Sequence, residues 1–193
     1  GTQASNFTSS NLTNSSATVG WDRGNGNNVL VVARSGGAVN ADPTDGTTYT
    51  ANAAFGSGTE IGTGNYVVYK GAGTSVNLTN LTASTTYHFA IYEYNDNCLI
   101  HNASELTGNA STISSTVTWN GSISTAWNNA SNWSNGIVPN STYDVVINNV
   151  SNDPTLGSSS DVCNSLTIQS GGVLISNNSS YKLVSGSIVI ESG

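Results

Sequence analysis

Charged side chains are scarce in this sequence of 193 residues, since Asp, Glu, Lys and Arg together make up only 8% of it. An ordinary soluble domain carries about 25%, so solubility must rest on Asn, Ser, Thr and Gly. Only four residues are Lys or Arg, and the formal net charge is −7. Binding to phosphates needs clustered Lys and Arg that release counterions. The composition therefore argues against a nucleic-acid partner.

Residues that favour helices are also scarce. Met is absent, and Glu occurs only at Glu60, Glu93, Glu105 and Glu191. Thr, Val, Ile, Tyr and Gly dominate instead, and these residues favour strands and tight turns. The 36% of hydrophobic residues fall largely in short alternating runs, unlike those of a disordered chain. We predict a folded, all-β protein.

The sequence has no apolar run long enough to cross a bilayer, no signal peptide and no lipidation signal. We therefore expect no membrane span. The polar composition fits an extracellular or cell-surface location, with any export signal removed or lying outside these residues.

Turn residues divide residues 1–114 into short runs with strand periodicity, separated by one long polar excursion at 35–64. Strands are expected at 6–13, 16–22, 29–34, 65–70, 75–81, 85–94 and 107–113. About seven short strands in about 110 residues indicate a two-sheet sandwich. Tyr87 begins a late strand after the corner at Leu81, where its hydroxyl can bond to the backbone upstream.

Trp21 on the second expected strand, together with the segment LTASTTYHFAIYEY, resembles a fibronectin type III domain. The insertion DGTTYTANAAFGSGTEIGTGNYVVYKGAG resembles a variant of that domain common in secreted surface proteins of Bacteroidota-type bacteria. The resemblance covers residues 1–114 and implies a β-sandwich, but it says almost nothing about a ligand.

Residues 115–193 have a different pattern, with strands expected at 143–148, 165–169, 173–176, 181–184 and 187–191. Short strands at such regular spacing fit either a hairpin meander or the start of a parallel β-solenoid. The spacing W-x-G…W…NW-x-x-G-x-x-P, from Trp119 to Pro139, resembles the leader of β-solenoid stretches in large bacterial adhesin-like proteins. A solenoid would have an uncapped edge at 187–193, where we expect a neighbouring domain or a copy of the same chain.

Trp119, Trp127 and Trp133 are the strongest candidates for ligand binding. Sugars stack on aromatic faces, and the Asn-rich surroundings can supply hydrogen bonds to hydroxyls. The competing interpretation, which we favour, is that the three indoles build a small core.

Calcium is the metal that the sequence fits best. Asp42 and Asp45 in a DPTDG turn and Asp96 in an NDN loop offer hard oxygen ligands. Asp-Pro and Asp-Gly are also ordinary turn formers whose side chains cap their own backbone. We favour the turn and expect no cofactor.

The two cysteines, Cys98 and Cys163, permit at most one internal disulfide. Free thiols, a bridge within the chain and a bridge between copies all stay open. Catalysis by a hydrolase needs paired carboxylates or a nucleophile with its base. The acidic residues fall mainly in expected loops without such a pair, so we predict no enzymatic activity.

Two functional hypotheses follow. The first is a non-catalytic structural or adhesive segment of a large bacterial surface or secreted protein, such as a fibre subunit. The alternative is a carbohydrate-binding module of a secreted polysaccharide hydrolase, with a polysaccharide or glycan as its partner. An exposed Trp127 or Trp133 beside a groove would favour the second hypothesis, and burial of both indoles would remove it.

Overall fold

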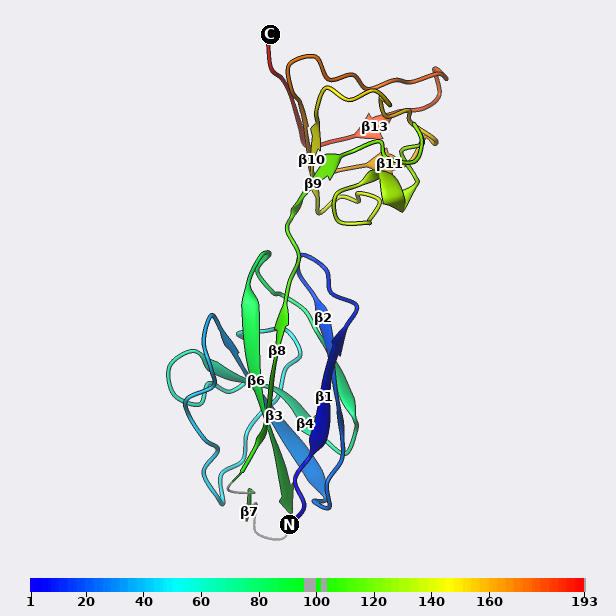
Figure 1. Cartoon of the computed structure of the whole chain (residues 1–193). Helices are drawn as coiled ribbons and strands as arrows, with labels where there is room; N and C mark the ends of the chain where they lie inside the picture. Colours follow the sequence, from blue (N-terminus) through cyan, green and yellow to red (C-terminus); the bar gives the residue numbers. More distant parts are fainter. Residues whose placement is uncertain (96–99, 102–103, 193) are drawn as a thin grey trace. The chain divides into compact units, whose positions relative to one another are not determined.

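The computed structural model describes residues 1–95, 100–101 and 104–192, which form two compact units, Gly1–Ile113 and Ser114–Gly193 (Figure 1). Among these described residues the regular structure is β-strand, apart from one turn of 3-10 helix, η1 (Ala130–Asn132). The prediction of an all-β protein is confirmed.

The N-terminal unit is a sandwich of two antiparallel sheets. Its strands are β1 (Ser5–Ser10), β2 (Ala17–Asp22), β3 (Asn28–Ser35), β4 (Asn65–Gly71), β5 (Ser75–Leu78), β6 (Thr86–Asn95), β7 (Ile100–His101) and β8 (Leu106–Ser111). One sheet has the order β1-β2-β5. In the other, β4, β3 and β6 are adjacent, and both β7 and β8 pair with β6. The predicted sandwich is confirmed.

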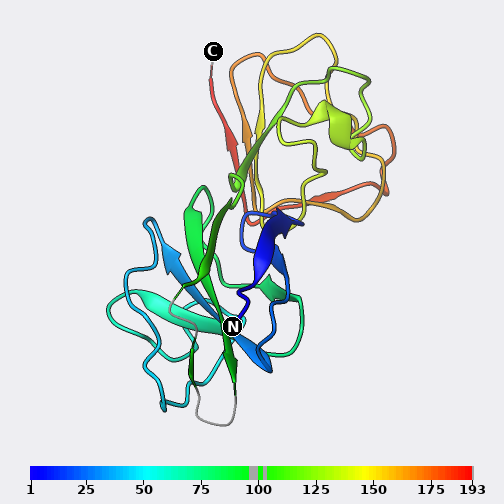
Figure 2. The same ribbon diagram turned by 60° about the horizontal axis from the view of Figure 1, so that its bottom comes forward.

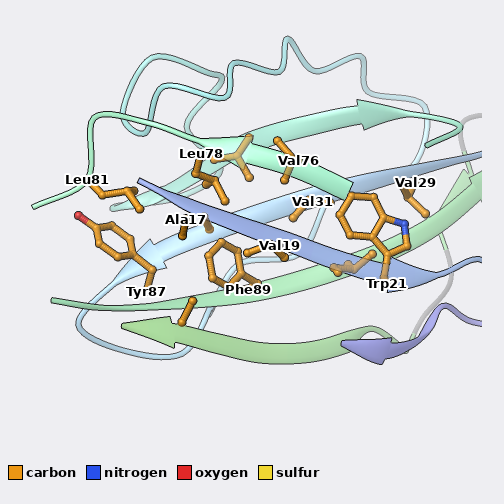
Figure 3. Close-up of a cluster of buried hydrophobic side chains, with 14 of the residues drawn as sticks. Ala17, Val19, Trp21, Val29, Val31, Val76, Leu78, Leu81, Tyr87 and Phe89 are labelled. Atoms are coloured by element: carbon orange, nitrogen blue, oxygen red, sulfur yellow. The ribbon is translucent and has the colours of Figure 1, made fainter. Parts of the chain in front are cut away.

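Alternating side chains of the two sheets meet in one apolar core. Ala17, Val19 and Trp21 of β2 face Val29 and Val31 of β3 (Figure 3). These residues are almost completely buried, because successive side chains of a strand point to opposite faces and one face of each strand is turned inward.

Tyr87 forms the predicted corner at one end of this core. Its ring is buried, and its hydroxyl oxygen accepts a hydrogen bond of 2.8 Å from the backbone N–H of Thr82. Leu81 packs into the same core (Figure 3). The hydrogen bond ties the connection between β5 and β6 to the start of β6.

Replacing Tyr87 by phenylalanine keeps the ring and removes only the acceptor. The Thr82 N–H then lacks its partner in a part-buried position, so we expect the unit to lose about 1–3 kcal/mol of stability. Urea unfolding of the wild-type and variant chains measures this loss. Tyr181→Phe, in the other unit, is the control and should leave the N-terminal unit unchanged.

Residues 35–64, which were expected to form a polar excursion, pack on the second sheet of the sandwich. This packing was not predicted from the sequence. Val39, Ala41, Tyr49, Ala51 and Ile61 pack on the outer face of the second sheet, against Leu30, Val32, Val67, Ala90, Tyr92 and Tyr94. The hydroxyl of Tyr92 also donates a hydrogen bond of 2.9 Å to Asp42. Both faces of β3 and β6 are therefore buried.

The C-terminal unit is built from parallel ladders. Its strands are β9 (Thr116–Trp119), β10 (Asp144–Ile147), β11 (Asp161–Val162), β12 (Ser165–Ile168), β13 (Leu183–Val184) and β14 (Ser187–Ile190). β9, β10, β12 and β14 form one parallel sheet in that order (Figures 1 and 2). A second parallel ladder joins β11 to β13, and single bridges link Ala126, Thr155 and Ile175.

The chain thus passes all three ladders in each full circuit, and we call one such circuit a coil. Equivalent residues Val145, Leu166 and Ile188 are 21 and then 22 residues apart. A hairpin meander would pair its strands antiparallel, so the meander alternative is wrong and the coils are those of a β-solenoid. The strand expected at 173–176 is reduced to the single bridge at Ile175.

Candidate interaction site

The three tryptophans at the start of the C-terminal unit form one buried cluster. Trp133 lies edge-to-face with both Trp119 and Trp127, with ring centroids 4.9 and 4.8 Å away. The Trp133 indole N–H donates to the Trp127 carbonyl, and the Trp119 indole N–H donates to the Asn152 carbonyl. All three residues are at most 2% exposed.

The packing of the three indoles explains the presence of Gly121 and Asn132 in the tryptophan motif. Gly121 has φ +56°, and a Cβ there would lie 2.6 Å from the Asn152 carbonyl oxygen. The Asn132 side chain is fully buried, and its Oδ1 accepts hydrogen bonds from the backbone N–H groups of Ile123 and Ser124. Its amide group donates to the carbonyl of Ala126. The motif therefore closes the first coil.

This closure corrects the ligand-binding assignment of Trp119, Trp127 and Trp133. A sugar needs an open aromatic face, and the three buried rings offer none. The competing interpretation, a small core, is the correct one. The carbohydrate hypothesis loses the residues on which it depended.

Two columns of inward-facing side chains run across the parallel sheet. One column contains Val117, Val145, Leu166 and Ile188, and the other contains Trp119, Ile147, Ile168 and Ile190. Val117, Val145 and Leu166 are at most 2% exposed, whereas Ile188 is 58% exposed. Trp119 and Ile147 are fully buried, whereas Ile190 is 73% exposed. Among the described residues, no further strand lies beside β14 to cover its inward side chains.

The β9 edge of this sheet and the β4 edge of the sandwich are covered. At the first edge of the parallel sheet, the Ser134 N–H donates to the Thr118 carbonyl, and Trp119 forms a bridge with Trp133. In the sandwich, the excursion pairs with β4 through the bridge between Glu60 and Tyr66. An uncovered apolar edge is a template for pairing with another strand. β14 is therefore the candidate interaction site.

The candidate calcium site does not assemble among the described residues. Asp42 accepts the hydrogen bond from Tyr92, and both Asp42 and Asp45 lie in an exposed turn next to the buried Pro43. Asp96 lies outside the described residues. Among those residues no group of three or more His, Cys, Asp or Glu is placed to hold a metal ion.

Cys163 is a free thiol that packs inside the C-terminal unit with 2% exposure. Burial raises the pKa of this thiol, although a hydrogen bond involving Ser185 acts in the opposite direction. Cys98, the other half of the disulfide considered above, lies outside the described residues.

We expect Cys163 to resist labelling until its unit opens. In a Cys98→Ser variant, a thiol reagent at pH 8 should react with Cys163 roughly 100-fold or more slowly than with a small free thiol. Burial and the raised pKa both reduce the reactive thiolate. The rate should rise to the free-thiol value in urea that unfolds the C-terminal unit. Rapid labelling of the native chain would contradict this burial.

In the part of the chain that the structure describes, no helix is long and apolar enough to cross a membrane.

Comparisons with known proteins concern the two units separately. Residues 118–193 match a family described as Domain of unknown function (DUF8693). The chain is similar to an FN3 domain of human collagen XX, with 19% identity, a TM-score of 0.37, and coverage of 57% of this chain and 91% of that chain. It is also similar to a redesigned β-sandwich protein, with 21% identity, a TM-score of 0.41, and coverage of 58% and 95%. A search of curated proteins found no match.

The sheet order and the tyrosine corner of the N-terminal unit are those of a fibronectin type III-like sandwich. At these identities and TM-scores the solved structures add nothing about function. The matched family covers only the C-terminal unit, and its description assigns no activity.

Proposed function

We propose that this chain is a non-catalytic structural segment of a bacterial surface or secreted protein, and that β14 joins it to its neighbour. The fibronectin type III-like sandwich acts as a spacer in this proposal. The C-terminal unit provides the junction, because its coils are closed at the tryptophan cluster and open at β14.

The exposure of β14 is the observation that supports the proposal best. Ile188, Val189 and Ile190 are 58%, 51% and 73% exposed. Burying an aliphatic side chain contributes about 1.5–3 kcal/mol relative to leaving it in water. Three adjacent aliphatic residues on an unpaired strand edge would promote aggregation of a free chain. At a junction, their burial would stabilise the contact with the neighbour.

Location outside the cell is tested with antibodies raised against the purified chain. Intact cells of the source organism, or their culture medium, should contain the antigen. Added protease should remove the cell-bound signal while a cytoplasmic marker survives. Labelling that requires permeabilised cells would overturn the proposal.

A further inference from the structure

We propose that the partner of β14 is one further parallel β-coil of about 22 residues that carries aliphatic side chains over Ile188 and Ile190. This inference rests on the joining role proposed above and names its partner. The partner is identified by its chemistry and spacing.

The coils already present show what covers such an edge. β10 lies on β9, β12 lies on β10 and β14 lies on β12, each parallel and in register over four residues. The inward side chains of β9 and β10 are at most 1% exposed where the next strand lies beside them, and in β12 Leu166 is buried and Ile168 is half-buried. Leu166, which has β14 beside it, is 2% exposed, whereas Ile188 at the next step is 58% exposed. The same interface, repeated once, would bury Ile188 and Ile190.

The other ladders also end in the last coil. The bridges through Ala126 and Thr155 end at Ile175, and the ladder from β11 ends at β13. Leu183 is half-buried, whereas Asp161, its partner in the coil before, is 8% exposed. Ile175 is half-buried, like its partner Thr155. A single added strand would cover only β14. A complete coil would pass all three ladder ends, so the partner is a coil.

A second copy of this chain does not offer a matching first coil. The outer edge of β9 is already occupied, because Ser134 donates to Thr118 and Trp133 bridges Trp119. Head-to-tail stacking of β14 on the β9 edge of another copy would have to displace this closure. Pairing β14 of one copy with β14 of another would leave the Ile175 and Leu183 ends open.

The partner's sequence is constrained by the two columns. The positions over Ile188 and Ile190 must be apolar, because a charge there would be buried without a counter-charge. The residue between them faces outward with Val189, Thr167 and Val146, so it can be polar or β-branched. Turns rich in Gly and Asn fit the corners, as they do at Gly171 and Asn178.

Coil duplication tests the inference in the full chain. Residues 169–190 are copied and added after Ile190, so that one more coil lies beside β14 with the copied Ile188 and Ile190 over the originals. In a solenoid, stability is roughly the sum of the coils and their interfaces. We expect the melting midpoint of the C-terminal unit to rise by roughly 5–10 °C. The urea m-value should rise as well, because more surface is buried.

The matched control carries the same addition with aspartate at the copied positions of Ile188 and Ile190. It should give no rise in the midpoint, because its columns are interrupted. The tyrosine corner and the rest of the N-terminal unit should be unchanged in every variant.

Two results would overturn the inference. In the first, the added coil does not raise the midpoint and protease removes the added residues as fast as an unfolded loop. In the second, the unmodified chain sediments as a dimer that Ile190→Asp dissociates, so that the partner is a second copy. Neither result bears on the antibody labelling of intact cells, which tests the proposed function separately.

Discussion

Replacing Glu93 by alanine is expected to lower the stability of the N-terminal unit by about 3–5 kcal/mol. Glu93 is 1% exposed, and its carboxylate accepts hydrogen bonds of 2.8 and 3.0 Å from Arg23 and of 2.6 Å from the Gly24 N–H. The Arg23 guanidinium also donates to the carbonyls of Gly26 and Ala72. Without the carboxylate, the guanidinium and the Gly24 N–H lose their shared acceptor.

Hydrogen exchange of peptides from β3 and β6 measures this loss, and peptides from β10 and β12 serve as the internal reference. Glu105→Ala removes an exposed carboxylate and is the matched control, with an expected change within about 0.5 kcal/mol. Arg23→Met combined with Glu93→Gln should cost less than the sum of the two single changes, because the buried charge and its partner leave together. Additive losses would contradict the coupling.

The strands of the sandwich could be predicted because their signal is local. Alternation of Ala17, Val19 and Trp21 predicted β2 to within a residue, and the corner at Tyr87 was predicted from its spacing to Leu81. Each depends on a few neighbouring residues. The ion pair between Arg23 and Glu93 joins residues 70 positions apart, so no local pattern indicates it.

The packing of the excursion on the outer sheet face was missed although β6 contains its signal. Ala90, Tyr92 and Tyr94 alternate with Phe89 and Ile91, so both faces of this strand are apolar. A strand with one face in water would carry polar residues on that face. The second apolar face required a cover, and the excursion is the segment that supplies it.

The parallel coils were only one of two alternatives because the spacing of seven or eight residues is ambiguous. That spacing separates successive sides of one coil, while strands that pair lie 28, 21 and 22 residues apart along the sheet. The longer repeat is visible in the inward columns, where Val145, Leu166 and Ile188 recur. The predicted edge at 187–193 follows from the same repeat.

Replacing Trp133 by alanine is expected to lower the stability of the C-terminal unit by about 3–5 kcal/mol. Trp133 contacts both other indoles of the cluster and is 2% exposed. Removing a buried Trp costs about 3–5 kcal/mol, and a unit of about 80 residues has a total stability of about 4–12 kcal/mol. The loss therefore takes away a large part of what holds the unit together. Fluorescence of Trp119 and Trp127 should shift to longer wavelength at a lower urea concentration.

Two variants separate the roles of Trp133. Trp133→Phe keeps an aromatic ring and removes the hydrogen bond to the Trp127 carbonyl, so its loss should be smaller than that of alanine. Ile123→Ala removes a side chain that is 66% exposed and should change stability by no more than about 0.5 kcal/mol. If Trp133→Ala instead left the unfolding transition in place and abolished binding to a polysaccharide, the cluster would be a sugar site after all. A loss of stability without polysaccharide binding identifies the tryptophan cluster as the core that closes the first coil of the unit.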